Sequence, residues 1–271
     1  MEDNLIDLTL TSPPYDDLRT YNEHLSGNKT EYNGYSFPFE KIAKELYRIT
    51  KKGGGVVVWV VGDATNKGSE TGTSFKQALF FKECGFDLYD TMIYQKTGTP
   101  FPQKTRYNQT FEYMFVFSKG KPNKFNPIMK KNVTAGAVRH SRKFRNVDGE
   151  MIPGFNGKPV NEYGIENNIW LIKNGMNKST KDVIAFQHPA IFPEELATKH
   201  IITWTQKGDL VYDPFMGSGT TAKLSIQLGR NWIGSELDEK YSELCNKRIE
   251  NIQYNELLID EYITKESLKK K

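Results

Sequence analysis

A glycine turn near the end of the chain limits the choice of fold more than any other feature. A strand-like run, Leu210 to Asp213, leads into the turn Met216 to Gly219, and a helical pattern follows from Ala222 to Leu228. A second strand pattern, Asn231 to Ser235, then ends on Glu236. This order predicts a βαβ unit in which a carboxylate closes the second strand, about 20 positions after the first strand, as in nucleotide-binding folds.

The turn departs from the pattern of dinucleotide-binding proteins. Thr220 and Thr221 follow Gly219, so a third glycine is missing from its usual position. A cofactor without a pyrophosphate, such as S-adenosylmethionine, does not need the full glycine-rich phosphate cradle. The turn therefore favours S-adenosylmethionine over a nicotinamide dinucleotide as the cofactor.

The rest of the sheet must come from earlier in the chain, because only 35 residues follow Glu236 and they begin with a helical stretch, Leu237 to Ile252. An amphipathic helix is predicted over Phe39 to Ile49. Four earlier segments have strand character: Leu5 to Leu10, Val56 to Val61, Leu88 to Tyr94 and Tyr113 to Phe117. Strands that alternate with helices predict a doubly wound α/β sheet, with the cofactor half last.

A rigid loop follows the first of these strands. It reads Thr11-Ser12-Pro13-Pro14-Tyr15, and its two prolines fix two φ angles and leave carbonyls without neighbouring N–H donors. The Ser12 hydroxyl and the loop carbonyls can accept hydrogen bonds from a planar amino group, while Tyr15 offers a face on which a base can stack. Taken alone, the same residues also fit an ordinary Pro-Pro turn at a strand end.

Together these motifs resemble the β class of amino-group DNA methyltransferases, in which motif IV precedes motif I. The matching segments are residues 11–15 with motif IV, 213–219 with motif I, 187–196 with motif X, Glu236 with motif II, and, more weakly, 48–63 with motifs V and VI and 94–119 with motifs VII and VIII. The resemblance implies a permuted Rossmann-like fold with three parts. These are a catalytic half at 1–118, a target-recognition insertion at 119–168 and a cofactor-binding half at 169–271.

The resemblance also implies roles for individual residues. The catalytic loop is Ser12, Pro13, Pro14 and Tyr15, and S-adenosylmethionine is held by Asp213, Phe215, Gly217, Ser218, Gly219, Thr220 and Glu236, with His188, Pro189 and Phe192 from the segment like motif X. One departure stands out, because family members usually have a further strand and an acidic residue before motif IV, where this chain has eleven residues. The sequence therefore leaves open what contacts the adenine of the cofactor.

The positive charge of the chain is concentrated in one region. Residues 113–147 contain no Asp or Glu but nine Lys and Arg residues, and because the whole chain carries a net charge of +4, the remainder is net acidic. Such a run is often only a solvated surface, but in this family it coincides with the target-recognition region, where cations neutralise phosphates. The candidate contacts to duplex DNA are Lys119, Lys130, Lys131, Arg139, Arg142, Lys143 and Arg145.

The loop also narrows the reaction. Methylation of carbon 5 of cytosine needs a cysteine nucleophile, and no cysteine occupies or borders residues 11–15. An exocyclic amine needs no covalent step, because its nitrogen can attack the methyl group directly. Ser12 and the Pro13 carbonyl can assist by accepting hydrogen bonds from its two N–H groups. The base would be flipped out of the duplex onto Tyr15, and Tyr107 and Phe111 are either the opposite wall or aromatic core residues.

The target atom follows from the resemblance. Family members with Ser at the first position of the loop usually modify cytosine N4, and those with Asp usually modify adenine N6, so Ser12 favours cytosine N4 and adenine N6 is the alternative. More distant alternatives are methylation of RNA or of a protein glutamine, and a nucleic-acid-binding module that has lost its activity.

Other cofactors and compartments find little support in the sequence. The four histidines form no metal-ligand pattern, no apolar run approaches 18 residues, and the two cysteines are not spaced for a disulfide framework. We therefore expect no metal, no membrane association and a cytoplasmic location. The family makes a homodimer plausible and leaves room for a cognate restriction endonuclease.

Overall fold

The computed structural model describes residues 1–14, 37–98, 104–138, 143–152, 154, 157–262, 264 and 267–268. Three of the predicted site residues, Tyr15, Arg139 and Arg142, lie outside the described residues. The chain divides into two compact units, the first formed by Met1–Asn126 and Asn168–Ile259 and the second by Pro127–Asn167 and Asp260–Lys271. Lys119 and Lys124, at the start of the predicted insertion, thus belong to the first unit.

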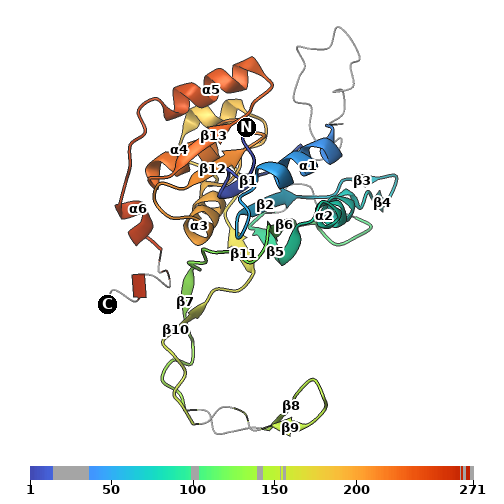
Figure 1. Ribbon diagram of the computed structural model, residues 1–271, viewed down its shortest axis with the longest axis vertical. Helices are drawn as coiled ribbons and strands as arrows, with labels where there is room; N and C mark the ends of the chain where they lie inside the picture. The colour runs from blue at the N-terminus through green and yellow to red at the C-terminus, as the bar shows by residue number, and fades with distance from the viewer. Residues whose placement is uncertain are drawn as a thin grey trace. The chain divides into compact units, whose positions relative to one another are not determined.

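A seven-stranded sheet forms the centre of the first unit (Figure 1). Its order is β11 (Ile169–Ile172), β5 (Asp87–Lys96), β6 (Phe111–Ser118), β2 (Val56–Val61), β1 (Leu8–Thr11), β12 (Leu210–Asp213) and β13 (Asn231–Gly234). Strand β6 is antiparallel to both neighbours, and every other pairing in the sheet is parallel. The predicted doubly wound α/β sheet is confirmed.

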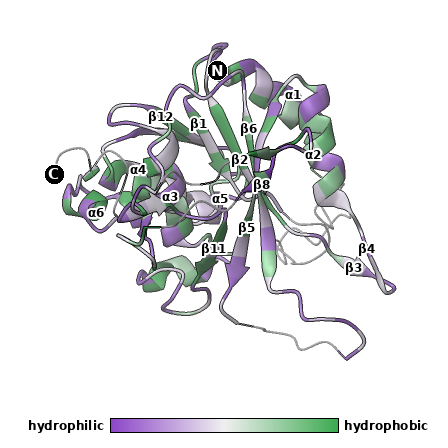
Figure 2. Cartoon of the chain, turned by 90° about the horizontal axis from the view of Figure 1, so that it is seen from below, coloured by the Kyte–Doolittle hydropathy of each residue, from purple (hydrophilic) through white to green (hydrophobic). Residues whose placement is uncertain are grey.

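Helices cover both faces of this sheet (Figures 1 and 2). The helices are α1 (Phe39–Ile49), α2 (Thr73–Glu83), α3 (Glu194–Trp204), α4 (Thr220–Gln227), α5 (Glu239–Ile249) and α6 (Leu257–Asp260), with a 3-10 turn η1 at Val183–Gln187. Helices α1 and α2 pack on each other, as α3 and α4 do. A short hairpin, β3 (Thr65–Asn66) and β4 (Ser69–Glu70), follows strand β2.

Burial on both faces explains the composition of the central strands. All six residues of β2 are buried, and its sequence is five valines and one tryptophan, as expected for a strand without a solvent face. Trp59 packs with Phe81 of α2 in the core cluster, and its indole N–H donates to Gln77 Oε1 at 2.8 Å. Helix α1 turns Ala43, Leu46 and Ile49 towards the same cluster.

The strand order contains a topological switch point. From β1 the chain passes through α1 to β2 on one side, whereas from β12 it passes through α4 to β13 on the other side. Since β1 and β12 are parallel neighbours, the connections diverge between their carboxyl ends. Doubly wound sheets bind ligands at such switch points. The residues that follow Thr11 and Asp213 therefore lie at the switch point.

The second unit is built from short hairpins. Strand β7 (Met129–Lys131) pairs with β10 (Tyr163–Ile165), and β8 (Phe144–Arg145) pairs with β9 (Met151–Ile152). Lys130, Lys131, Lys143 and Arg145 are exposed on these elements. The unit therefore presents part of the predicted basic surface to solvent.

Lys119 does not belong to that surface. Its ammonium group donates to the carbonyls of Tyr47 at 2.5 Å and Thr50 at 3.1 Å and to Asn4 Oδ1 at 3.0 Å, and it lies 4.4 Å from the centre of the Tyr47 ring. It thus caps the carboxyl end of α1, a favourable place for a cation. Because β6 is antiparallel, its end at Ser118 lies beside the start of β2, at the edge away from Ser12. The Lys119 ammonium group is therefore engaged within the first unit, and its contact with DNA stays a prediction.

Candidate active site

The loop predicted to be catalytic begins at the end of β1. Ser12 and Pro14 are half-buried and Pro13 is buried. Thr11, the last residue of the strand, is fully buried, and its hydroxyl donates to Asp213 Oδ1 at 2.6 Å, across 202 positions of sequence. The structure thus joins the start of the loop predicted to be catalytic to the end of the strand that precedes the glycine turn. Sequence reasoning did not assign Thr11 a role.

Asp213 is the centre of a set of buried hydrogen bonds. Besides Thr11, its carboxylate accepts from the Thr221 hydroxyl at 2.7 Å and from the Phe215 N–H at 3.0 Å. Burial raises the pKa of Asp213 to about 6, although the three hydrogen bonds act in the opposite direction. This geometry agrees with the predicted role of Asp213 in orienting the turn, since its carboxylate contacts the turn, helix α4 and strand β1.

Glu236 lies beside the glycine turn, at the end of β13. Its Oε2 accepts from the Gly217 N–H at 2.7 Å, and its Oε1 accepts from Leu237 and Asp238 at 2.9 and 3.0 Å. The residue is only half-buried. A carboxylate has about four acceptor positions, so Glu236 can hold the turn and accept further hydrogen bonds from a ligand.

Two glycines of the turn adopt the left-handed conformation, at φ values of 51° for Gly217 and 81° for Gly219. A Cβ atom on Gly219 would come within 2.5 Å of Cys245 Sγ, and one on Gly217 within 3.0 Å of His188 Nε2. Packing against helix α5 and the His188 ring therefore requires glycine at both positions, whatever ligand the turn binds.

The segment that resembles motif X does lie against the turn. His188 is buried, and its ring packs edge-to-face on the ring of Tyr241 of α5, with 4.3 Å between the ring centres. Its Nδ1 accepts a hydrogen bond from the Ala190 N–H at 3.1 Å. Pro189 is exposed and Phe192 is half-buried in the same segment. Phe215, in the turn itself, packs edge-to-face on Phe37 at 5.2 Å, at the margin of the core.

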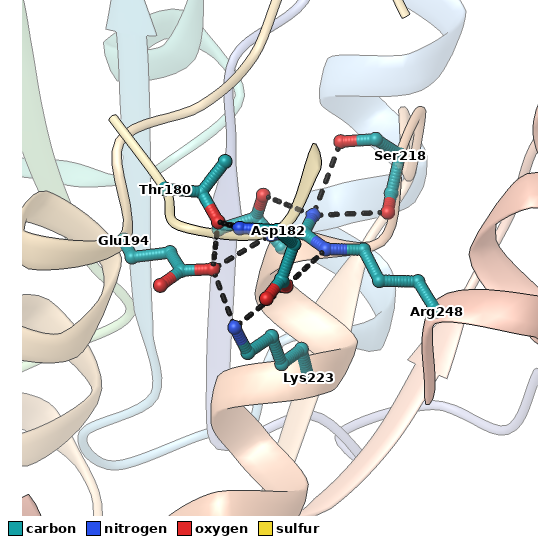
Figure 3. A network of polar contacts seen from close by, with 7 residues as sticks. Thr180, Asp182, Glu194, Ser218, Lys223 and Arg248 are labelled. Atoms are coloured by element: carbon teal, nitrogen blue, oxygen red, sulfur yellow. Dashed lines mark hydrogen bonds and ion pairs between the residues drawn. The ribbon is translucent and has the colours of Figure 1, made fainter. Parts of the chain in front are cut away.

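A buried ionic network lies behind the turn (Figure 3). The Arg248 side chain, only 1% exposed, donates to Asp182 Oδ2 at 2.9 Å and to Glu194 Oε1 at 2.7 Å, and Lys223 Nζ donates to the same two oxygens at 2.7 Å each. Burial raises the pKa of Asp182, but the hydrogen bonds from Lys223 and Arg248 outweigh it and the net shift is downward. Two cations and two anions thus balance one another.

Arg248 also donates hydrogen bonds to polar groups of the glycine turn. Its Nη1 donates to the Ser218 carbonyl at 3.0 Å, to Ser218 Oγ at 3.2 Å and to Thr220 Oγ1 at 2.9 Å. The side chains of Ser218 and Thr220, predicted to bind the cofactor, are therefore engaged in holding the turn onto α5. No local signal in the sequence pointed to Arg248, because its partners lie 28 to 68 positions away.

Two predicted aromatic residues are not part of the core. The Tyr107 side chain is 99% exposed, and Phe111, at the start of β6, is 36% exposed. The start of β6 lies at the edge where β2 ends, which is the edge of the Ser12 loop. The alternative that these are core aromatics is wrong, and a role as walls for a base remains a prediction.

The histidines and carboxylates form no metal site in the part of the chain that the structure describes. His200 lies fully buried between Trp170 and Trp204 and accepts the Trp204 indole N–H at 3.3 Å, and burial lowers its pKa to about 3. It is a neutral core residue. Among the same described residues, no helix is both long and apolar enough to cross a membrane.

Comparisons with known proteins fit this geometry. A family model described as DNA methylase matches residues 6–247. The orphan methyltransferase M.BamHII of Bacillus amyloliquefaciens is 55% identical over 251 residues, which cover 92% of this chain and 90% of that protein. The type II methyltransferase M.HinfI of Haemophilus influenzae is 27% identical over 267 residues, which cover 92% of this chain and 64% of that protein.

Solved structures share the fold at lower identity. PvuII DNA methyltransferase, described as cytosine-N4-specific, superposes with a TM-score of 0.59 at 23% identity, over 95% of this chain and 90% of that one. The complex of M1.HpyAVI with S-adenosylmethionine superposes with a TM-score of 0.55 at 23% identity, over 90% of this chain and 89% of that one. At these identities the likeness supports the architecture alone.

The ionic network predicts the effect of removing Arg248. We expect Arg248→Met to lower the free energy of unfolding by about 3 kcal/mol, because two partly buried carboxylates would share one remaining cation. Lys247→Met is the matched control on the same helix, since Lys247 is 67% exposed and makes a long ion pair of 3.9 Å with Glu243. This change should lower the free energy of unfolding by less than about 0.5 kcal/mol. Urea denaturation measures both. Equal costs would show that the network adds no net stability.

Proposed function

The chain belongs to the DNA methylase family, the N6/N4 amino methyltransferases, and on that premise we propose that it methylates the N4 amine of cytosine in duplex DNA. The DNA methyltransferase activity follows from family membership. The choice of cytosine is carried by one observation, Ser12 at the first position of the loop. A carboxylate there would repel the ring acceptor next to the amine in cytosine (N3) and in adenine (N1) alike, so the choice of cytosine rests on the association of Ser with cytosine N4 in the family.

The loop residues act on the amine directly. The lone pair of an exocyclic amine is delocalised into the ring, and it becomes nucleophilic when the nitrogen moves towards tetrahedral geometry. Ser12 Oγ and the Pro13 carbonyl accept the two N–H bonds and favour that geometry as positive charge develops on the nitrogen. The two prolines keep both acceptors in fixed positions. Tyr15 stacks on the flipped base, with Tyr107 and Phe111 as candidates for the other side.

The cofactor is S-adenosylmethionine, and the residues around the turn suit it. When bound, it supplies a methyl group on a sulfonium. Glu236 would accept hydrogen bonds from the ribose hydroxyls, the backbone of residues 215–219 would line the cofactor, and His188, Pro189 and Phe192 would cover its methionine part. Ser218 and Thr220 contribute through the backbone, because their side chains are bonded to Arg248.

The second unit carries the DNA contacts that we assign. Lys130, Lys131, Lys143 and Arg145 are exposed there, and cations on polar hairpins fit the phosphates of a duplex. Lys124 is left out, because its ammonium group lies 3.3 Å from Asp7 and also pairs with Asp209. The assignment of Arg139 and Arg142 rests on the sequence alone.

The biological setting is also a proposal. M.BamHII is named an orphan methyltransferase, which supports a role for this chain without a cognate restriction endonuclease. A DNA substrate supports a cytoplasmic location. Homodimer formation rests only on the resemblance to the family.

The target atom can be determined directly. DNA methylated by the purified protein and digested to nucleosides should contain N4-methylcytosine in mass spectrometry, and the Ser12→Ala variant should lower the rate about 10²-fold or more, since one of two acceptors is lost. Detection of N6-methyladenine alone would overturn the cytosine proposal and leave the amine mechanism in place. If neither methylated base is found, both the cytosine proposal and the amine mechanism are overturned.

Glu236 should contribute to cofactor affinity. Glu236→Ala removes the acceptor for two hydroxyls and for the Gly217 N–H, so we expect binding of S-adenosylmethionine to weaken by about 1 to 3 kcal/mol in calorimetry. Glu236→Gln keeps one acceptor oxygen and should fall between that variant and the parent. Glu243→Ala, an exposed carboxylate on the neighbouring helix, serves as the control. Unchanged affinity in Glu236→Ala would remove Glu236 from the cofactor site.

The DNA surface predicts a salt dependence. Replacing Lys130, Lys131, Lys143 and Arg145 together by alanine should flatten the slope of log affinity against log salt by up to about four units. Lys119→Met is the control, because it removes a helix cap and should lower thermal stability without changing the slope. A quadruple variant with the parental slope would place the DNA contacts elsewhere.

A further inference from the structure

The backbone ladder between β1 and β12 stops short of the active site. Its paired residues are Leu8 with Val211 and Thr9 with Tyr212, and the chains continue to Thr11 and Asp213 before each enters its loop. At that level the hydrogen bond from Thr11 Oγ1 to Asp213 Oδ1, at 2.6 Å, connects the two strand ends. Thr221 adds a long contact of 3.5 Å to the Leu10 carbonyl.

The surroundings leave this bond little freedom. Thr11 is 0% exposed and Asp213 is 4% exposed, so neither group can exchange its partner for water. Thr11 is β-branched and pairs with Trp59 of β2 through its backbone, which restricts its χ1 angle. The second oxygen of Asp213 is held by Thr221 at 2.7 Å. A shift of the Asp213 carboxylate is therefore transmitted to the residue directly before Ser12.

Asp213 is equally coupled to the cofactor turn. Its Oδ1 accepts the Phe215 N–H at 3.0 Å as well as the Thr11 hydroxyl. One oxygen atom thus contacts both the turn assigned to the cofactor and the strand that carries the amine-binding loop. The separation of these two parts decides how far the methyl group must travel.

We propose that Thr11 is a positioning residue, which sets the distance between the Ser12 loop and the cofactor turn through Asp213. This role rests on the proposed amine methyltransferase function. The Thr11 side chain is fully buried and its hydroxyl donates to Asp213, so its loss should act on the rate of methyl transfer and leave the binding of both partners intact. A misplacement of about 1 Å between reacting groups lowers rates by about 10²-fold.

Thr11→Val tests this role, because valine keeps the shape of threonine and removes only the hydroxyl. We expect kcat to fall about 10- to 100-fold, while the dissociation constants of S-adenosylmethionine and DNA stay within about threefold of the parent. Thr11→Ser keeps the hydroxyl and should restore most of kcat. Assays are run at a temperature at which circular dichroism shows every variant to be folded.

Thr9→Val is the matched control. Thr9 is on the same strand and is also fully buried, but its hydroxyl has no hydrogen-bond partner among the described residues. The same chemical change at Thr9 should therefore leave kcat at the parental value. If Thr11→Val also keeps parental kcat, or if Thr9→Val loses as much as Thr11→Val, the positioning role is refuted.

Hydrogen exchange separates this proposal from the proposed function, because it requires no methyl transfer. Binding of S-adenosylmethionine to the parent and to Thr9→Val should slow exchange in the peptide that covers residues 8–14, and this protection should be lost in Thr11→Val. Equal protection in all three proteins would overturn the coupling through Thr11. A parent that transfers methyl to adenine would refute the cytosine target and leave the coupling result standing.

Discussion

A carboxylate buried at the carboxyl end of strand β12, Asp213, is the constraint on which the site depends. Burying an ionised Asp213 without partners would cost several kcal/mol, so the fold has to bring donors to it from every side. These donors come from strand β1, from the turn and from helix α4. Meeting the hydrogen-bond requirement of one side chain therefore brings the end of β1, the glycine turn and the start of α4 to the same point. The switch point between β1 and β12 is where the topology allows this.

The glycine turn is held from two further directions. Glu236 accepts a turn N–H from the side of β13, and Arg248 donates to the Ser218 carbonyl from the side of α5. Polar side chains in and around the turn are thereby used to hold it, which leaves its backbone and the half-buried Glu236 to meet a ligand. Preorganisation of this kind lowers the cost of ordering a loop when a cofactor binds. The balanced charges of Arg248, Lys223, Asp182 and Glu194 explain how such a buried network can be tolerated.

The sequence predicted what depends on local patterns and failed where partners are distant. The bounds of α1 and β2 match the predictions because amphipathic spacing and a continuous apolar run are local signals, whereas β1 begins three residues later than predicted. Helix α2 was not predicted, because Ser74 and Gln77 form part of its buried face and these polar residues give no apolar periodicity. The contacts of Lys119 were not predicted, because its position in a charge run does not reveal that β6 ends beside the carboxyl terminus of α1. Thr11 and Arg248 could not be assigned, since their partners are set by tertiary structure.

The adjacency of β1 and β12 also explains why the order of motifs along the chain matters little to the chemistry. The bond between Thr11 and Asp213 closes a loop of about 200 residues, but the entropy of closure grows only with the logarithm of loop length. Placing the catalytic strand before or after the cofactor strand therefore changes the cost of assembling the site by only a small amount. What the site requires is that two parallel strands lie side by side with their connections diverging, because this brings the Ser12 loop and the glycine turn to the same carboxylate. The order of the motifs is that of the β class, while the adjacency of the two strands determines where the loop and the turn meet.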